Sequence, residues 1–334
     1  MPNVTTHKKS SGIGTARNHS FDAVKGYLIF LVVVGHIVVD NVADNNFKAA
    51  IYFFHMPLFL AVTGYFVRAK TLHLSIVGIL KKYELSLLKP YILAYSVYTA
   101  LAWLVLVDDL TLEQIALSIL YPFYHLWYVP AIFVFIFFLK FTSKIGIPIS
   151  ATLFFAFLIT VTYAAIGGPH IDQLSFFKFI GDKRFYHYFF YFCLGYFIAQ
   201  NSNYKVQLPF LTLPFLLYLA ISYNNIWLSG LSSVLANVAL ISITLSICAI
   251  SQIENIKESN LMVKLGRCSL PIYLWHVAPI AALKMLFKYF DLPIEIGERT
   301  LFYICISILM LAFIACLLTL EKRSFPMKAW LFGK

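Results

Sequence analysis

Apolar stretches long enough to cross a lipid bilayer recur along the whole of this 334-residue chain. About 20 mostly apolar residues cross a hydrocarbon core of about 30 Å, and a segment in that core must satisfy its backbone hydrogen bonds internally. With 60% hydrophobic and only 12% charged residues, the composition is not that of a soluble globular protein. These features predict an all-α fold, a polytopic membrane helix bundle with about ten transmembrane helices. The ten stretches are 21–39, 47–67, 85–107, 121–139, 145–166, 185–200, 208–223, 227–250, 269–287 and 299–320.

The fourth stretch differs from the others because it contains Pro122 and Pro130. Proline removes a backbone donor and disturbs the preceding helical turn, so this stretch predicts a kinked or re-entrant start.

Basic residues are distributed unevenly between the two sides of the predicted bundle. If residue 1 lies in the cytoplasm, the segments on that side carry 18 of the 26 Lys and Arg residues and the opposite segments carry 7. The excess of Lys and Arg in cytoplasmic loops therefore predicts that both termini are cytoplasmic. The same rule accounts for the net charge of +11, so we expect no nucleic acid partner.

No linker or soluble domain interrupts the apolar stretches, because the longest interruptions are too short to fold alone. We predict a disordered cytoplasmic tail at 1–17, a single membrane domain at 18–325 and a short cytoplasmic tail at 326–334. The first residues lack the apolar core of a signal peptide, so we expect no cleavage. The five cysteines are scattered and fit neither a disulfide framework nor a metal pattern, so no metal site is expected.

The first apolar stretch carries ionisable residues on one face. Lys25 and His36 stand eleven positions apart, which returns the helix to within about 20° of the same direction and separates the two side chains by about 16 Å. A long ligand with an anionic end could contact both. Asp40 follows His36 by one turn and could orient its imidazole. The alternative is that Lys25 reaches to the headgroups and Asp40 caps the helix end.

Five histidines fall inside or at the edge of the predicted spans: His36, His55, His125, His187 and His276. A single buried histidine is more often a hydrogen-bonded packing residue than a catalyst. Ionisable groups inside spans are costly, however, and usually line a site. We expect His36 and His55 to enter the same cavity in the outer half of the bundle.

Four motifs, in order along the chain, carry a resemblance to a known family. They are Asp22 to His36, Phe53 to Phe59 with Thr63 to Phe66 after it, His125 to Val129, and Ser269 to His276. Together they resemble the integral-membrane acyltransferase family 3, in its fucose 4-O-acetyltransferase-like branch. The predicted ten spans agree with that family.

The resemblance implies transfer of an acyl group, usually acetyl from acetyl-coenzyme A, to a hydroxyl of a surface glycan. The acceptor would be O-antigen, capsule, another exopolysaccharide or a lipid-linked oligosaccharide, and the enzyme would lie among the lipids of the bacterial cytoplasmic (inner) membrane. In the family, a basic residue and a histidine separated by ten intervening residues are essential, and these are Lys25 and His36 here. Lysine replaces the more usual arginine, which keeps the charge but not the bidentate geometry. Lys81 and Lys82 match basic residues that the family places before its third span, although the charge asymmetry alone also accounts for them.

Coenzyme A carries phosphate charges and a long arm that ends in a thioester. We therefore expect Lys25, Lys81 and Lys82 to bind the donor at a cytoplasmic mouth. His36 would act as general base on the acceptor hydroxyl, or would accept the acetyl group transiently. We expect His55, Trp127 and His276 to contact the acceptor.

Two other functions fit the same composition. A transporter or flippase for a lipid-linked saccharide or small solute would use buried histidines as a proton relay or as substrate contacts. The absence of an evident internal repeat weakens, without excluding, a transporter built from inverted repeats. A structural subunit of an export complex would tolerate substitution of Lys25 and His36.

Overall fold

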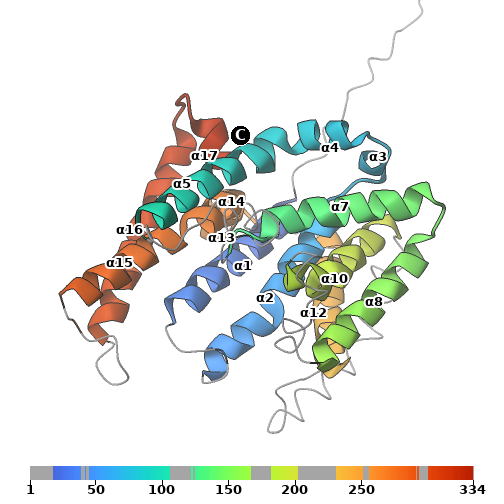
Figure 1. Ribbon diagram of the computed structural model, residues 1–334, viewed down its shortest axis with the longest axis horizontal. Coiled ribbons are helices and arrows are strands. Elements are labelled where there is room, and N and C mark those ends of the chain that lie inside the picture. The colour runs from blue at the N-terminus through green and yellow to red at the C-terminus, as the bar shows by residue number, and fades with distance from the viewer. Residues whose placement is uncertain are drawn as a thin grey trace, which may run out of the picture.

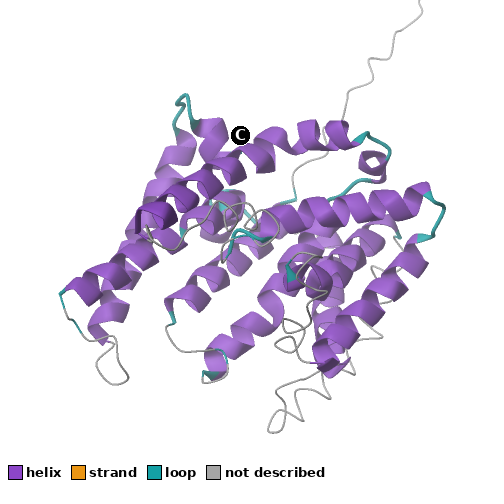
Figure 2. Cartoon of the chain, in the orientation of Figure 1, coloured by secondary structure: helices purple, strands orange, loops and turns teal. Residues whose placement is uncertain are grey.

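The computed structural model describes residues 18–38, 42, 45–105, 122, 125–166, 182–201, 231–250, 256–290, 292 and 300–333. Within these residues the regular structure is entirely helical, which confirms the predicted all-α fold (Figures 1 and 2). The helices are α1 (His19–Ile37), α2 (Asn46–Tyr65), α3 (Ala69–Leu72), α4 (Ile76–Tyr83), the π-helical turn η1 (Glu84–Leu88), α5 (Lys89–Val105), α7 (Tyr128–Lys144), α8 (Ile149–Ile166), α10 (Lys183–Gln200), α12 (Leu231–Ile250), α13 (Leu261–Arg267), α14 (Ser269–Trp275), α15 (Val277–Tyr289), α16 (Thr300–Lys322) and α17 (Lys328–Phe332).

Five helical segments are long and apolar enough to cross a membrane, judged by length and composition within the described part of the chain. They are His19–Ile37, Asn46–Tyr65, Leu231–Ala249, Ser269–Tyr289 and Thr300–Lys322. The chain is therefore a membrane protein of helices. The count of ten spans and the cytoplasmic position of both termini stay predictions, and the stretch 208–223 and the tail 1–17 lie outside the described residues.

The boundaries of two predicted spans differ from the observed helices. The fourth was expected over 121–139, but α7 begins at Tyr128, after a turn at residues 125–127. Pro130 explains the shift because proline is tolerated in the first turn of a helix, where its missing N–H is not needed. The third was expected to begin at residue 85, but helical structure is continuous from Ile76 through η1 into α5.

The helices α1 and α13 pack with their backbones in contact. A Cβ added to Gly26 would lie 1.9 Å from the carbonyl oxygen of Met262, and one added to Gly266 would lie 1.7 Å from that of Asp22. Small residues let membrane helices approach this closely. Arg267 at the end of α13 extends the contact, with its Nε 3.7 Å from a carboxylate oxygen of Asp22.

A second pair of glycines joins α2 to α10. A Cβ on Gly64 would lie 2.1 Å from the carbonyl oxygen of Phe192, and one on Gly195 would lie 1.9 Å from that of Ala61. Consequently α1 with α13 and α2 with α10 form two tight pairs, and α1 and α2 also contact each other. Figure 1 shows α15, α16 and α17 on one side of these pairs and α8 and α12 on the other, with α4 and α5 along the top edge.

Pro57 interrupts the hydrogen bonds of α2, and a neighbouring helix compensates. Proline has no N–H, so the carbonyl of Phe53, four residues earlier, loses its partner within the helix. The side-chain amide of Asn237 on α12 donates to this oxygen over 3.1 Å. Breaks in membrane helices are tolerated where another helix satisfies the freed backbone group.

Candidate active site

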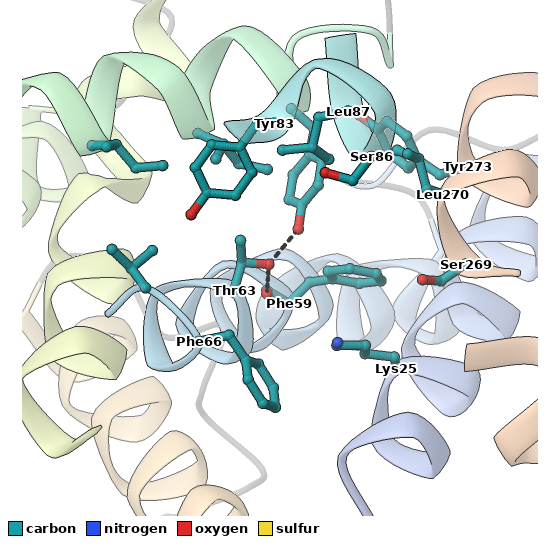
Figure 3. A pocket seen from close by; sticks show the side chains of 14 residues that line it. Lys25, Phe59, Thr63, Phe66, Tyr83, Ser86, Leu87, Ser269, Leu270 and Tyr273 are labelled. Carbon is teal, nitrogen blue, oxygen red and sulfur yellow. Dashed lines mark hydrogen bonds between the residues drawn. The ribbon is translucent and has the colours of Figure 1, made fainter. Parts of the chain in front are cut away.

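A cavity of about 240 Å³ opens among α1, α2, α4, η1, α7 and α14 (Figure 3). Lys25 reaches it from α1, and its ammonium lies 4.6 Å from the centroid of the Phe66 ring. On the facing side, the π-helical turn η1 contributes Ser86 and Leu87, and π-turns in helices often mark functional sites. The complete lining is Lys25, Phe59, Thr63, Phe66, Val67, Tyr83, Ser86, Leu87, Tyr128, Ile132, Ile136, Ser269, Leu270 and Tyr273.

One wall of the cavity carries a short chain of hydroxyl hydrogen bonds. The Thr63 hydroxyl donates to the carbonyl oxygen of Phe59 over 3.0 Å (Figure 3). The Tyr128 hydroxyl lies 2.5 Å from Thr63 Oγ1. Because a carbonyl can only accept, the Thr63 proton points to Phe59 and the Tyr128 hydroxyl donates to Thr63. The oxygen of Tyr128 therefore offers lone pairs as its remaining hydrogen-bonding capacity.

Histidines from four separate parts of the chain gather next to this cavity. The ring of His276 lies 4.9 Å from that of His36 and 5.2 Å from that of His125, measured between centroids. The fourth histidine, His55, contacts this group through Tyr52, whose ring centroid lies 6.3 Å from that of His36 and 5.1 Å from that of His55. We call His36, His55, His125 and His276 the histidine cluster.

The ring of Tyr273 separates the cavity from the histidine cluster. Tyr128 and Tyr273 both line the cavity, and their ring centroids are 5.2 Å apart. On its other side, Tyr273 lies 5.7 Å from His125 and 6.2 Å from His276. The cavity that contains Lys25 and the cluster that contains His36 are thus about one aromatic ring apart.

Two prolines explain why His276 stands at a break between helices. Pro271 and Pro279 cannot donate to the carbonyls of residues 267 and 275, so the helical run is interrupted after each of those positions. His276 lies at the second interruption, between α14 and α15, and its side chain is 0% exposed. Its Nδ1 lies 2.8 Å from the Tyr273 carbonyl oxygen, so the imidazole satisfies the backbone at the end of α14.

A comparison with known protein families matches residues 18–319 to a family described as an acyltransferase domain. The chain belongs to acyltransferase family 3. This acyltransferase is also similar to the Nodulation protein NolL of Sinorhizobium fredii (strain NBRC 101917 / NGR234), with 40% identity over 82 residues that cover 22% of each chain. A second relative is the Nodulation protein NolL of Mesorhizobium japonicum (strain LMG 29417 / CECT 9101 / MAFF 303099), with 43% identity over 56 residues and 15% of each chain. The chain thus aligns with about a fifth of the length of these curated relatives, and no solved structure matches it.

The structure of the acyltransferase brings some of the predicted site residues together. Lys25 lines the cavity, His36 and His276 are neighbours, and His55 joins them through Tyr52. His125 also belongs to the cluster, although its role was left open in the sequence.

Other predicted site residues lie away from the cavity. Lys81 is exposed and Lys82 donates to the Thr71 hydroxyl, and neither lysine lines the cavity. Partial burial, followed by the positive charges of Arg68 and Lys70, lowers the pKa of Lys82 from its ordinary value. A role for these lysines in donor binding stays a prediction.

Trp127 and Asp40 complete the predicted set. Trp127 is buried, stacks on Tyr188 at 5.1 Å and lies 5.0 Å from the guanidinium of Arg184. Its contact with the acceptor stays a prediction, and Asp40 lies outside the described residues. In the part of the chain that the structure describes, no group of three or more His, Cys, Asp or Glu side chains is placed to hold a metal ion.

Sequence reasoning did not single out Tyr128, Tyr273 or Thr63. All three stand inside the motifs that carry the family resemblance, which is the signal that could have found them. With 21 tyrosines in the chain, however, a packing role was the simpler explanation for each one.

Proposed function

We propose that this acyltransferase is a membrane O-acetyltransferase that moves an acetyl group from acetyl-coenzyme A to a hydroxyl of a surface glycan. The donor would enter from the cytoplasmic side, and the acceptor would be O-antigen, capsule, another exopolysaccharide or a lipid-linked oligosaccharide. The proposal includes ten spans, cytoplasmic termini and a place in the bacterial inner membrane. The observation that carries it is the cavity containing Lys25, which lies one aromatic ring from the cluster containing His36.

The cavity fits the narrow end of the donor better than the whole molecule. Pockets that enclose a drug-sized ligand usually measure about 300–1,000 Å³. A volume of about 240 Å³ with a largely apolar lining suits an extended arm ending in a thioester. The charge of Lys25 at this cavity favours a phosphorylated ligand, and the Tyr128 oxygen can accept a hydrogen bond from an amide N–H of the arm.

His36 provides the base that the reaction requires. It takes the proton of the acceptor hydroxyl as the hydroxyl oxygen attacks the thioester carbonyl, and it returns that proton to the leaving thiolate. The membrane around the bundle excludes bulk water and so protects the thioester from hydrolysis. Tyr273 lies between the donor cavity and the cluster that contains the base, so we infer that its ring moves aside when the thioester advances.

Replacing His36 with alanine tests this function in cells. We expect O-acetyl signals to disappear from the proton NMR spectrum of the surface polysaccharide, while the amounts of polysaccharide and of membrane-inserted protein stay at the wild-type level. His73→Ala, which removes an exposed histidine between α3 and α4, is the matched control and should leave O-acetylation unchanged. Unchanged O-acetylation in His36→Ala would refute the proposal, and loss of the whole polysaccharide would favour a flippase.

A further inference from the structure

The imidazole of His276 has a fixed tautomer. Its Nδ1 lies 2.8 Å from the carbonyl oxygen of Tyr273 and 3.1 Å from that of Ile272. A carbonyl oxygen can only accept, so in the neutral ring the proton lies on Nδ1 and Nε2 carries the lone pair. His276 is therefore a hydrogen-bond acceptor at Nε2.

This Nε2 is buried and has no hydrogen-bond partner among the residues that the structure describes. Burial of a polar atom without a partner costs free energy, and native proteins rarely leave such an atom unsatisfied without a functional reason. The working enzyme therefore requires a hydrogen-bond donor at this Nε2.

The two imidazoles closest to His276 differ in their ability to donate. The ring of His125 lies 5.2 Å away, but its Nε2 donates to the carbonyl oxygen of Leu274 over 3.0 Å. The Nδ1 of His125 therefore carries a lone pair and cannot donate. His36 lies 4.9 Å away, and no backbone carbonyl in the described ranges holds either of its nitrogens. At this separation a rotation of the His36 ring brings one N–H within hydrogen-bonding distance of His276 Nε2.

We propose that His276 is a positioning residue for His36. The N–H of His36 donates to Nε2 of His276, which holds the His36 ring in the tautomer whose other nitrogen faces the acceptor hydroxyl. This inference rests on the proposed function, and it gives His276 the part that a carboxylate plays behind the base of a Ser-His-Asp triad. It differs from the acceptor contact that the sequence suggested for His276.

His36 alone takes up and releases the proton in this step. Its free nitrogen takes the hydroxyl proton while the hydroxyl oxygen bonds to the thioester carbonyl carbon. The carbon–sulfur bond breaks, and His36 gives the same proton to the departing thiolate. His276 stays neutral throughout, because its own proton remains on the Nδ1 that faces Tyr273.

Two conservative variants separate positioning from packing. In His276→Asn the side-chain amide N–H takes the place of Nδ1 and keeps the bond to Tyr273, but nothing replaces the acceptor at Nε2. In His276→Gln the amide oxygen replaces Nε2 as acceptor, and the backbone bond is lost. The assay uses purified full-length protein in lipid nanodiscs, radiolabelled acetyl-coenzyme A and alkali-de-O-acetylated polysaccharide from the producing cells.

We expect His276→Asn to lower kcat about 100-fold or more, since a general base contributes about 10²–10⁴-fold. The KM for acetyl-coenzyme A should stay within about threefold, because the donor cavity is lined by other residues. His276→Gln should recover at least about tenfold over His276→Asn. His187→Asn is the control: its Nδ1 is also buried without a partner in the described residues, but its ring packs on Tyr163 and Tyr188, and kcat should not change.

Two results would overturn the positioning role: wild-type kcat in His276→Asn, or equal losses in the Asn and Gln variants at unchanged thermal stability. In either case an inactive His36→Ala enzyme in the same assay would show that the proposed function still holds. An active His36→Ala enzyme would instead refute the proposed function.

Discussion

Replacing Gly266 with alanine tests how closely α1 and α13 must approach for the site to work. The added Cβ would lie 1.7 Å from the carbonyl oxygen of Asp22 on α1. A relaxed carbon–oxygen contact needs about 3.3 Å, so the two helices would have to separate by about 1.6 Å. No change of rotamer relieves the clash, because the opposing atom belongs to the backbone.

This separation would move site residues on α1 away from those on α14. Helix α1 carries Lys25 and His36, whereas α13 leads through a single residue into α14, which carries Tyr273 and is followed directly by His276. A displacement of about 1 Å can cost a reaction about 100-fold, and overpacking usually costs about 1–3 kcal/mol of stability. We expect Gly266→Ala to lower kcat about 100-fold and to lower the Tm by several degrees. The measurements are acetyl transfer in nanodiscs below the Tm of the variant, and thermal unfolding followed by intrinsic fluorescence.

Gly78→Ala is the matched control for this experiment. Gly78 lies in α4, and the atom closest to its added Cβ is the side-chain hydroxyl oxygen of Ser75 at 3.2 Å. Alanine favours a helix over glycine by about 1 kcal/mol, which offsets the small adjustment of Ser75. Its kcat and Tm should stay close to the wild type. Wild-type kcat and Tm in Gly266→Ala would refute the argument from close packing.

Two further variants test the cavity and the proline break. Lys25→Met should raise the KM for acetyl-coenzyme A about 10- to 100-fold, since a charged hydrogen bond contributes about 1.5–3 kcal/mol. Lys25→Arg should restore the wild-type KM, and the control Lys144→Met, on the exposed end of α7, should leave the KM unchanged. An unchanged KM in Lys25→Met would exclude a donor contact. Asn237→Leu should lower the free energy of unfolding by about 1–3 kcal/mol by leaving the Phe53 carbonyl without its donor. In a Pro57→Ala background, residue 57 again supplies an N–H for the Phe53 carbonyl. There Asn237→Leu should lower the free energy of unfolding by less, as measured by urea or thermal unfolding. Equal losses in both backgrounds would show that Asn237 does not compensate for Pro57.

The part of the site that lies within one helix could be predicted from the sequence. Lys25 and His36 share a face of α1 because eleven residues make three helical turns, and that relation requires no knowledge of the rest of the chain. The proximity of His36 and His276 could not be derived in this way, because 240 positions separate them and only the packing of α1 against α13 and α14 brings them together. The family resemblance named both motifs without giving the distance between them.

The lysines of α4 illustrate a second limit of sequence reasoning. Lys81 and Lys82 stand just before η1, a π-helical turn that accommodates an extra residue. This change of register alters which residues of the helical run face the cavity, and the lining includes Tyr83, Ser86 and Leu87 but neither lysine. No residue preference or hydrophobic period predicts a π-turn, so the residues that face the cavity could not be derived from the spacing.

The helix break and the histidine cluster have a common physical origin. A membrane helix interrupted by proline exposes backbone carbonyls in a medium without water, and side chains must donate to those carbonyls. Asn237 does so for Phe53, while His276 and His125 donate to carbonyls in the last turn of α14. Histidine differs from the other donors because its rigid ring carries a second nitrogen on the opposite side. Once one nitrogen is fixed on the backbone, the other is fixed as an acceptor that points away from the helix. The break between α14 and α15 can therefore position an imidazole lone pair beside His36 without placing any further charge in the membrane.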